Sequence, residues 1–134
     1  MDDRQFSAYL DCLDHPKQLE LTPNVASLYL LYSEHVTSLA YSNLDLFMGK
    51  PVPDLSIDAI LAHIPTNGGH CYQHSELMYA ALNHLGFDVT RVACWVLMGK
   101  DFKQDMPLNH NILLVKIDGD TYLCDPGLAS TSPR

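Results

Sequence analysis

The spacing of apolar residues in this chain changes once, at Gly86, and that change limits the folds open to it. Before Gly86, apolar residues recur every three or four positions in residues 3–13, 25–39, 56–64 and 71–85, which predicts helices with one buried face. The third of these helices is expected to stop at Pro65. After Gly86, residues 87–97, 112–117 and 121–124 have the composition and alternation of strands. Helices first and strands afterwards, without alternation or repeats, predict an α+β fold.

We therefore expect a helical bundle over residues 1–86 and the start of an antiparallel β domain over residues 87–134. The chain has 134 residues, of which 47% are hydrophobic, and a formal net charge of -8. A chain of this size can bury a core of its own. Its longest apolar run, residues 92–98, is far below the ~18 to 20 residues that span a bilayer, and its start lacks a signal pattern. We therefore expect a cytoplasmic protein without a membrane partner. Nucleic-acid binding is not expected either, because the basic residues are few and scattered.

The four cysteines are far apart in the sequence, which favours reduced thiols over a disulfide framework. Cys94 and Cys124 lie in strand-like runs and are expected to be small core residues. Cys71 differs, because it follows the Gly68-Gly69 breaker and begins a predicted helix. A helix N-terminus favours a thiolate, and the glycine turn can present backbone N–H groups to a developing oxyanion.

A hairpin turn at Asp118-Gly119 brings two further residues together. This dipeptide predicts a two-residue turn, which sets the register of the flanking strands. His110 and Asp125 then share one face as diagonal neighbours, roughly 7 to 8 Å apart at Cα. The carboxylate can orient the imidazole at that separation. A histidine bonded to a neighbouring asparagine, and an Asp-Pro-Gly turn, are the alternative interpretations.

Cys71, His110 and Asp125 together supply the nucleophile, the base and the orienting carboxylate of a Cys-His-Asp triad. Metal binding is a rival use, because two further histidines lie within three residues of Cys71. The spacing has no paired CxxC or HExxH signal, so no metal is expected. His35 is expected at the surface of its helix or partly buried there.

Several stretches of the chain resemble the arylamine N-acetyltransferase family in order and spacing. They are the Asn-Gly-Gly-His-Cys-Tyr-Gln of residues 67–73, residues 81–90, His110 ahead of residues 113–115, the turn at 118–119 and the Leu-Cys-Asp of residues 123–125. Residues 42–45 and 49–52 resemble the family's Glu-Asn-Leu-Asp and Gly-Arg-Pro-Val. The resemblance therefore covers nearly the whole chain.

This resemblance implies a papain-like fold whose triad falls on Cys71, His110 and Asp125. It also implies a ping-pong reaction in which Cys71 takes an acetyl group from acetyl-CoA. The acetyl group then passes to a small aromatic amine, hydrazine or hydroxyarylamine. By position in the family, the substrate pocket would include Val96, Leu128 and Ser130, and the site for the CoA pantetheine would include Pro107 and Leu108.

The chain also departs from the family pattern. Asn67 stands where the family has arginine, His70 where it has an aromatic residue, and the loop after Asp125 is altered. Family members are longer and use their C-terminal part to complete the β domain. Without that part, we expect an open sheet edge that invites self-association. Two other functions remain open: a transglutaminase-like cysteine hydrolase, and a truncated, non-catalytic relative that acts as a binding module.

Overall fold

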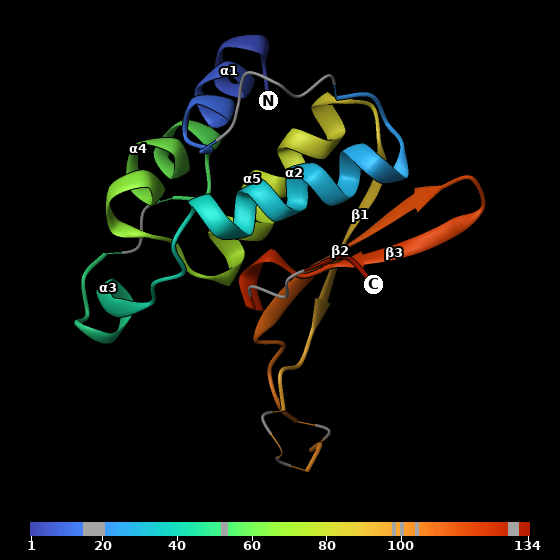
Figure 1. The fold of residues 1–134 in the computed structure, drawn as a ribbon. Coiled ribbons are helices and arrows are strands. Elements are labelled where there is room, and N and C mark those ends of the chain that lie inside the picture. The colour runs from blue at the N-terminus through green and yellow to red at the C-terminus, as the bar shows by residue number, and fades with distance from the viewer. Residues whose placement is uncertain (15–20, 52–53, 98, 100, 104, 129–131) are drawn as a thin grey trace.

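The computed structural model describes residues 1–14, 21–51, 54–97, 99, 101–103, 105–128 and 132–134. Five helices precede three strands within this part of the chain, and the helices gather on one side of the sheet (Figure 1). This order confirms the predicted α+β fold. The elements are α1 (Asp3–Asp11), α2 (Val25–Ser38), α3 (Leu44–Phe47), α4 (Ile57–Asn67), α5 (Cys71–His84), β1 (Asp88–Cys94), β2 (His110–Ile117), β3 (Asp120–Cys124) and the 3-10 helix η2 (Pro126–Leu128).

Short polar side chains begin the longer helices of the N-terminal half. Asp2 caps α1, Asn24 caps α2 and Ser56 caps α4, each by accepting a hydrogen bond from a backbone N–H of the first turn. The expectation that α4 stops at Pro65 is wrong, since the helix continues through it. Its end is set instead by Gly68, which has a φ of 73° and donates its N–H to a carbonyl of the last turn. The short helix α3 was not predicted.

The sheet has the order β1-β2-β3, and both pairs of strands are antiparallel. Asp118 and Gly119 both have positive φ, as a tight hairpin turn of this kind requires, and Ile117 lies opposite Asp120. The register predicted from the turn is therefore confirmed. The outer edge of β3 forms two backbone hydrogen bonds with the C-terminal residue, at one position along the strand. Self-association through a sheet edge stays a prediction.

The strand β1 pairs with β2 up to Cys94, which lies opposite His110. The strand predicted to reach residue 97 thus ends earlier, and the chain leaves the sheet in the loop of residues 95–109. Cys94 is partly exposed and is not part of the core cluster, so its prediction as a core residue is wrong. Cys124, in contrast, is fully buried, as predicted.

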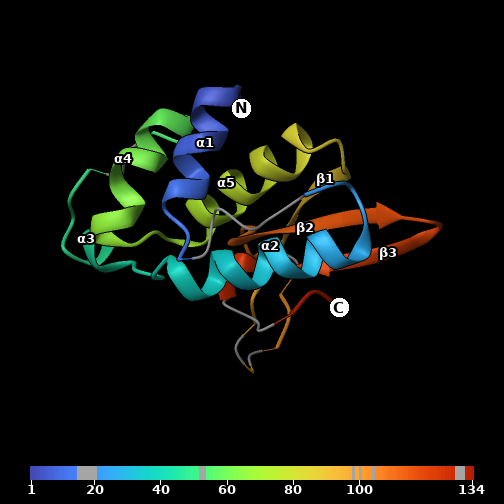
Figure 2. The ribbon, with the colours of Figure 1, turned by 45° about the horizontal axis from the view of Figure 1, so that its top comes forward.

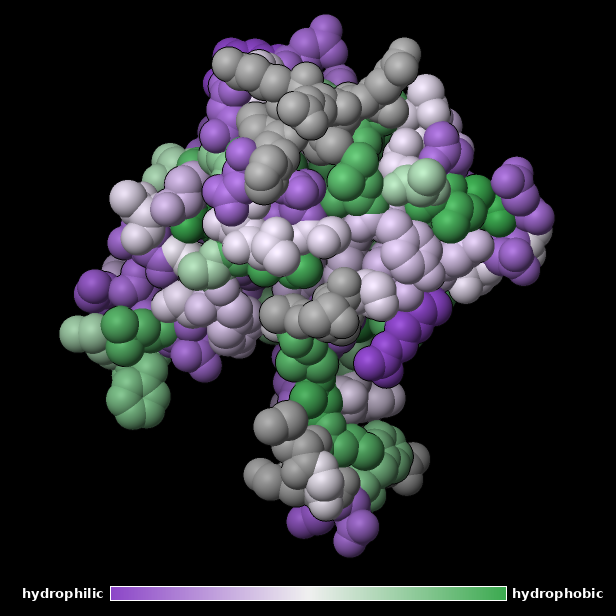
Figure 3. Space-filling view, in the orientation of Figure 1, coloured by the Kyte–Doolittle hydropathy of each residue, from purple (hydrophilic) through white to green (hydrophobic). Residues whose placement is uncertain are grey.

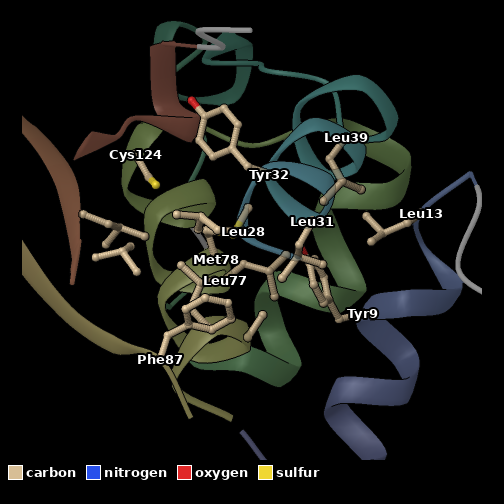
Figure 4. Close-up of a cluster of buried hydrophobic side chains, with 14 of the residues drawn as sticks. Tyr9, Leu13, Leu28, Leu31, Tyr32, Leu39, Leu77, Met78, Phe87 and Cys124 are labelled. Atoms are coloured by element: carbon tan, nitrogen blue, oxygen red, sulfur yellow. The ribbon is translucent and has the colours of Figure 1, made fainter. Parts of the chain in front are cut away.

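The hydrophobic core fills the space between α2, α5 and the inner face of the sheet (Figure 4). Burying one such large apolar side chain contributes about 1.5–3 kcal/mol to stability. Figure 2 shows α1 and α4 side by side, next to α5, so the start of α5 is supported by packed helices. Members of the core include Leu28, Leu31, Tyr32, Leu77, Met78, Leu82, Leu113, Val115 and Cys124.

A row of hydrogen-bonded polar side chains crosses this apolar interior. The Tyr9 hydroxyl lies 3.0 Å from Nδ1 of His35, and Nε2 of His35 lies 2.9 Å from Nδ1 of His74. Nε2 of His74 is 3.2 Å from the carbonyl oxygen of Ala40. Because a carbonyl only accepts, each donor in the row points the same way, from Tyr9 toward Ala40. His35 is fully buried, so its prediction as a surface or partly buried residue is wrong.

Large apolar side chains are exposed in two places that project from the molecule, at α3 and in the loop between β1 and β2 (Figure 3). Phe47 in α3 is 90% exposed, and Trp95 and Phe102 contact each other in the loop. In the described part of the chain, no helix has the length and apolar character that a membrane span needs.

Candidate active site

The candidate nucleophile begins helix α5. His70 is the N-cap, and Cys71 is the first helical residue, as the sequence predicted. Nδ1 of His70 accepts a hydrogen bond from the backbone N–H of Tyr72 at 3.3 Å. In return, the side-chain oxygen of Gln73 accepts from the backbone N–H of His70 at 3.1 Å. This reciprocal capping fixes the first turn of the helix, and with it the position of the thiol.

Two glycines fit the turn before Cys71 because neighbouring backbone and side-chain atoms leave no room for a Cβ. A Cβ on Gly68 would lie 2.8 Å from the carbonyl oxygen of Ala40 and from Cβ of Ser42. A Cβ on Gly69 would lie 2.7 Å from the side chain of Ile64. The backbone of Gly69 also bonds to Ala40 and Ser42, at 3.0 and 2.8 Å. The turn is therefore held by a neighbouring strand-like segment.

The candidate base is paired with a carboxylate. Nε2 of His110 lies 2.8 and 2.9 Å from the two carboxylate oxygens of Asp125. Both residues are buried, at 3% and 8% exposure. Asp125 also accepts a hydrogen bond from the backbone N–H of Leu128 at 3.1 Å. Because a carboxylate only accepts, Nε2 of His110 carries the proton, which leaves Nδ1 as the nitrogen that can accept another.

Gly127 lies against both Cys71 and His110. A Cβ added to Gly127 would be 2.6 Å from Cβ of Cys71 and 3.1 Å from Cε1 of His110. The absence of a side chain at this position lets the start of α5 approach the start of β2. Among the described residues, no hydrogen bond joins the thiol to the imidazole, so the two are neighbours without a direct bond.

The half-buried Cys71 thiol experiences opposing influences on its ionisation. Burial raises the pKa of Cys71, and the negative charge of Asp125 adds to that effect. Hydrogen bonds from the backbone N–H groups of Tyr72 and Cys71 lower the pKa, as expected at a helix N-terminus. Since the raising effects dominate, the pKa of Cys71 lies above that of an ordinary thiol, and a neighbouring base would favour its ionisation.

Comparison with known proteins fits this arrangement. Residues 24–133 match the family model for N-acetyltransferases. The chain belongs to the arylamine N-acetyltransferase family. It is 34% identical over 119 residues to an arylamine N-acetyltransferase of Mycolicibacterium smegmatis, covering 83% of the chain, and 32% identical over 102 residues to human arylamine N-acetyltransferase 2, covering 74%. The solved structure of the Mycobacterium marinum arylamine N-acetyltransferase in complex with CoA superposes with a TM-score of 0.81, at 32% identity and 96% coverage of the chain.

The chain spans less than half the length of these arylamine N-acetyltransferases. It covers 43% of the M. smegmatis protein, 35% of the human protein and 49% of the M. marinum chain. The residues of this chain that match the family model, 24–133, include Cys71, His110 and Asp125.

The loop after β1 is joined to the site by Asn109, a residue that the sequence analysis did not single out. Its side-chain oxygen accepts from the backbone N–H of Val96 at 2.8 Å, and its amide donates to the carbonyl of Val96 at 3.4 Å. Its own N–H donates to the carbonyl of Cys94. The Asn109 amide thus takes the place of a peptide group and holds Val96 beside the strand that begins with His110. An asparagine before a candidate base gave no signal in the sequence by itself.

Of the remaining residues suggested by the resemblance, Pro107, Leu108 and Leu128 belong to the described part of the chain. Pro107 and Leu108 are exposed in the loop just before β2. Leu128 is 56% exposed in η2 and is tied to Asp125 through its backbone N–H. Ser130 lies outside the described residues.

A small polar cavity lies behind the nucleophile, on the side of α3 and α4. Its volume of about 10 Å³ is enough for one water molecule. Two buried donors line it without a hydrogen-bond partner in the described structure, Nε2 of His70 and Nε2 of Gln73. Ser42, Asp45 and Asn67 also line it and offer oxygen acceptors. Among the described residues, no three histidine, cysteine or acidic side chains gather as a metal site requires.

Proposed function

We propose that this chain carries the acetyl-accepting centre of an arylamine N-acetyltransferase. Cys71 takes an acetyl group from acetyl-CoA as a thioester and passes it to the nitrogen of a small aromatic amine, hydrazine or hydroxyarylamine. The observation that supports this most strongly is the contact of His110 Nε2 with both carboxylate oxygens of Asp125, on an imidazole that borders Gly127, as Cys71 does. A base held in one tautomer next to a cysteine is the arrangement that thiol acyl transfer requires.

In the first half-reaction, Nδ1 of His110 removes the thiol proton of Cys71. The thiolate sulfur attacks the thioester carbonyl of acetyl-CoA, and the carbonyl oxygen becomes an oxyanion. In this proposal, backbone N–H groups at the start of α5 stabilise the developing charge. The intermediate collapses to acetyl-Cys71, and the departing CoA sulfur takes the proton from His110. Asp125 stabilises the positively charged imidazole throughout this exchange.

In the second half-reaction, the amine nitrogen attacks the acetyl carbonyl on Cys71. His110 accepts the proton that the amine loses, and the Cys71 sulfur leaves as the thiol or thiolate. We place the acceptor amine between Val96, Leu128 and Ser130, and the pantetheine arm of acetyl-CoA along Pro107 and Leu108. A reducing cytoplasm is the proposed setting, because the reaction requires a free Cys71 thiol.

The donor half-reaction can be tested without knowing the amine. Intact-protein mass spectrometry after brief incubation with acetyl-CoA should show one added acetyl group on the wild type and none on Cys71→Ala. Cys12→Ser is the matched control, because Cys12 is the C-cap of α1, away from the site, and this variant should be acetylated like the wild type. Release of CoA and acetate without any amine would support the hydrolase instead. An unreactive Cys71 in a folded chain would support the non-catalytic binding module.

A further inference from the structure

A second cysteine borders the candidate base. Cys94 lies directly opposite His110 in the register of β1 and β2, so both side chains are on the same face of the sheet. Opposed residues in an antiparallel pair have Cβ atoms about 4.5–5.5 Å apart. Cys71 borders His110 from another direction, with Gly127 in contact with both. The imidazole thus has a cysteine neighbour from β1 and another from α5.

The ionisation of Cys94 reflects the same neighbours. The pKa of Cys94 is raised by burial first, and further by the charges of Asp125 and Cys71. Both cysteines are free and partly exposed. Cys94 is the last residue of β1, an edge strand, and the loop of residues 95–109 begins immediately after it. Its backbone is therefore paired on one side only, and it can adjust its position more easily than a residue inside the sheet.

The other two cysteines have different surroundings. The Cys12 thiol donates a hydrogen bond to the carbonyl of Ala8 within its own helical segment, and Cys124 is fully buried in the core. In neither case does the structure place the thiol beside His110 or Asp125. Cys94 is set apart by its position at the site, and its chemistry as a second nucleophile is not used by the proposed acetyl transfer.

We propose that Cys94 is a resolving cysteine, which converts a peroxide-oxidised Cys71 into a Cys71–Cys94 disulfide. In the first step the Cys71 sulfur attacks one oxygen of hydrogen peroxide, the O–O bond breaks, and Cys71 becomes a sulfenic acid while the other oxygen leaves as water. In the second step the Cys94 sulfur attacks the Cys71 sulfur, the S–O bond breaks, and the hydroxyl leaves as water with the proton of Cys94. Two thiols have then lost two electrons, and one peroxide has become two waters.

The disulfide would store Cys71 in a form that a dithiol reductant can reverse. Without a nearby thiol, a sulfenic acid can be oxidised further to the sulfinic acid, which such reductants do not restore. Formation of the bond requires the two Cβ atoms to approach about 3.5–4.5 Å, and the position of Cys94 at the end of an edge strand allows its backbone to move. This inference goes beyond the proposed function, because it requires the two thiols and a peroxide but no acetyl transfer.

The test treats the reduced chain with hydrogen peroxide, blocks the remaining thiols with an alkylating reagent and maps the peptides by mass spectrometry. The wild type should fall from four free thiols to two, with a crosslink between the peptides that contain Cys71 and Cys94, and dithiothreitol should restore all four. Cys94→Ser should instead trap dimedone on Cys71, or gain two oxygen atoms there that dithiothreitol does not remove. Cys12→Ser should form the same crosslink as the wild type.

Three results would overturn the proposal. The first is that Cys71 is oxidised to sulfinic acid at the same rate in the wild type and in Cys94→Ser. The second is a crosslink that joins Cys71 to Cys12 or Cys124. The third is that no crosslink forms in the wild type while Cys71 reacts with dimedone. The crosslink map needs only the wild type, so it decides the question even if the serine variant folds poorly. Acetylation by acetyl-CoA is measured separately, so a failure of the proposed function leaves the oxidation result interpretable.

Discussion

The buried histidines of the helical half and the buried histidine at the sheet end differ in how many of their ring nitrogens are hydrogen-bonded. In the helical half, both ring nitrogens of His35 and of His74 are bonded to protein groups. At the sheet end, His110 bonds to Asp125 through Nε2, and its Nδ1 has no partner among the described residues. A histidine with both nitrogens occupied holds structure together, whereas one with a fixed tautomer and an open nitrogen can move a proton. Burial alone does not separate the two kinds.

The largest expected effect comes from removing the open nitrogen. His110→Asn keeps a polar side chain but supplies no base, so we expect acetylation of Cys71 to slow by about 10²–10⁴-fold. The free energy of unfolding should fall as well, because the substitution leaves the buried Asp125 carboxylate without its imidazole partner, so acetylation rates are compared per folded molecule. Single-turnover acetylation measures the first effect, and urea unfolding measures the second.

A matched substitution on the helical side should lower stability without a comparable loss of rate. His74→Asn should reduce the free energy of unfolding, because it interrupts the row between His35 and Ala40. The acetylation rate of the molecules that remain folded should change far less than in His110→Asn. If His110→Asn is acetylated within about tenfold of the wild-type rate, the contrast between the two groups fails.

The second prediction concerns the contribution of a single hydroxyl group to stability. Tyr9→Phe removes only the hydroxyl that donates to Nδ1 of His35, which leaves a buried acceptor without its donor. We expect a loss of about 1–3 kcal/mol in the free energy of unfolding. Tyr29→Phe is the control, because the Tyr29 hydroxyl makes a 3.3 Å bond at a partly exposed position and should cost much less. Equal losses in the two variants would show that the row contributes nothing special.

The local parts of this structure were predictable from sequence. The Asp118-Gly119 turn fixes the register between β2 and β3 within a few residues, so the approach of His110 to Asp125 followed from it. The start of α5 at Cys71 followed equally from the glycine pair before it. Each of these inferences depends on backbone preferences that neighbouring residues decide.

The parts that failed depend on contacts between distant segments. His35 looked like an exposed or partly buried helix residue, because the sequence does not show that α1 and α5 bury it from two sides through Tyr9 and His74. The cavity behind the nucleophile likewise combines residues from α3, α4 and α5. Cys94 looked like a core residue, but its strand ends there and leaves it partly exposed. The periodicity of a sequence indicates which face of a helix or strand is apolar. It does not indicate which distant segment packs against the other face.

The third prediction concerns pH. Burial lowers the pKa of His35 well below its ordinary value of 6.5, and it lowers that of His74 as well. Below pH 6.5 the unfolded chain therefore binds protons that the folded chain does not, so stability is present above pH 6.5 and falls as the pH decreases through the folded pKa values. The loss is at most about 1.4 kcal/mol per pH unit for each histidine.

Other groups titrate over the same range, so the decisive quantity is the difference between two proteins. His35→Leu removes one of the two titrating groups and fills the site with an apolar side chain. Its free energy of unfolding should decrease less steeply than that of the wild type between about pH 7 and pH 5. Parallel pH profiles for the two proteins would show that His35 does not contribute.

The smallest effect tests whether a hydrogen bond at the site end acts on substrate rather than on stability. Asn109→Ala releases Val96 from the edge of β2 while leaving the pairing of Cys94 with His110 in place. Exposed hydrogen bonds contribute about 1 kcal/mol, so we expect the KM for the acceptor amine to rise roughly fivefold, with little change in the rate at which Cys71 is acetylated. Asn83→Ala removes a comparable exposed amide contact on α5 and should leave both quantities unchanged. If Asn109→Ala slows acetylation of Cys71 by the same factor as it raises KM, the Asn109 amide positions His110 itself. Asn109 would then support the reacting imidazole and not only the residue Val96.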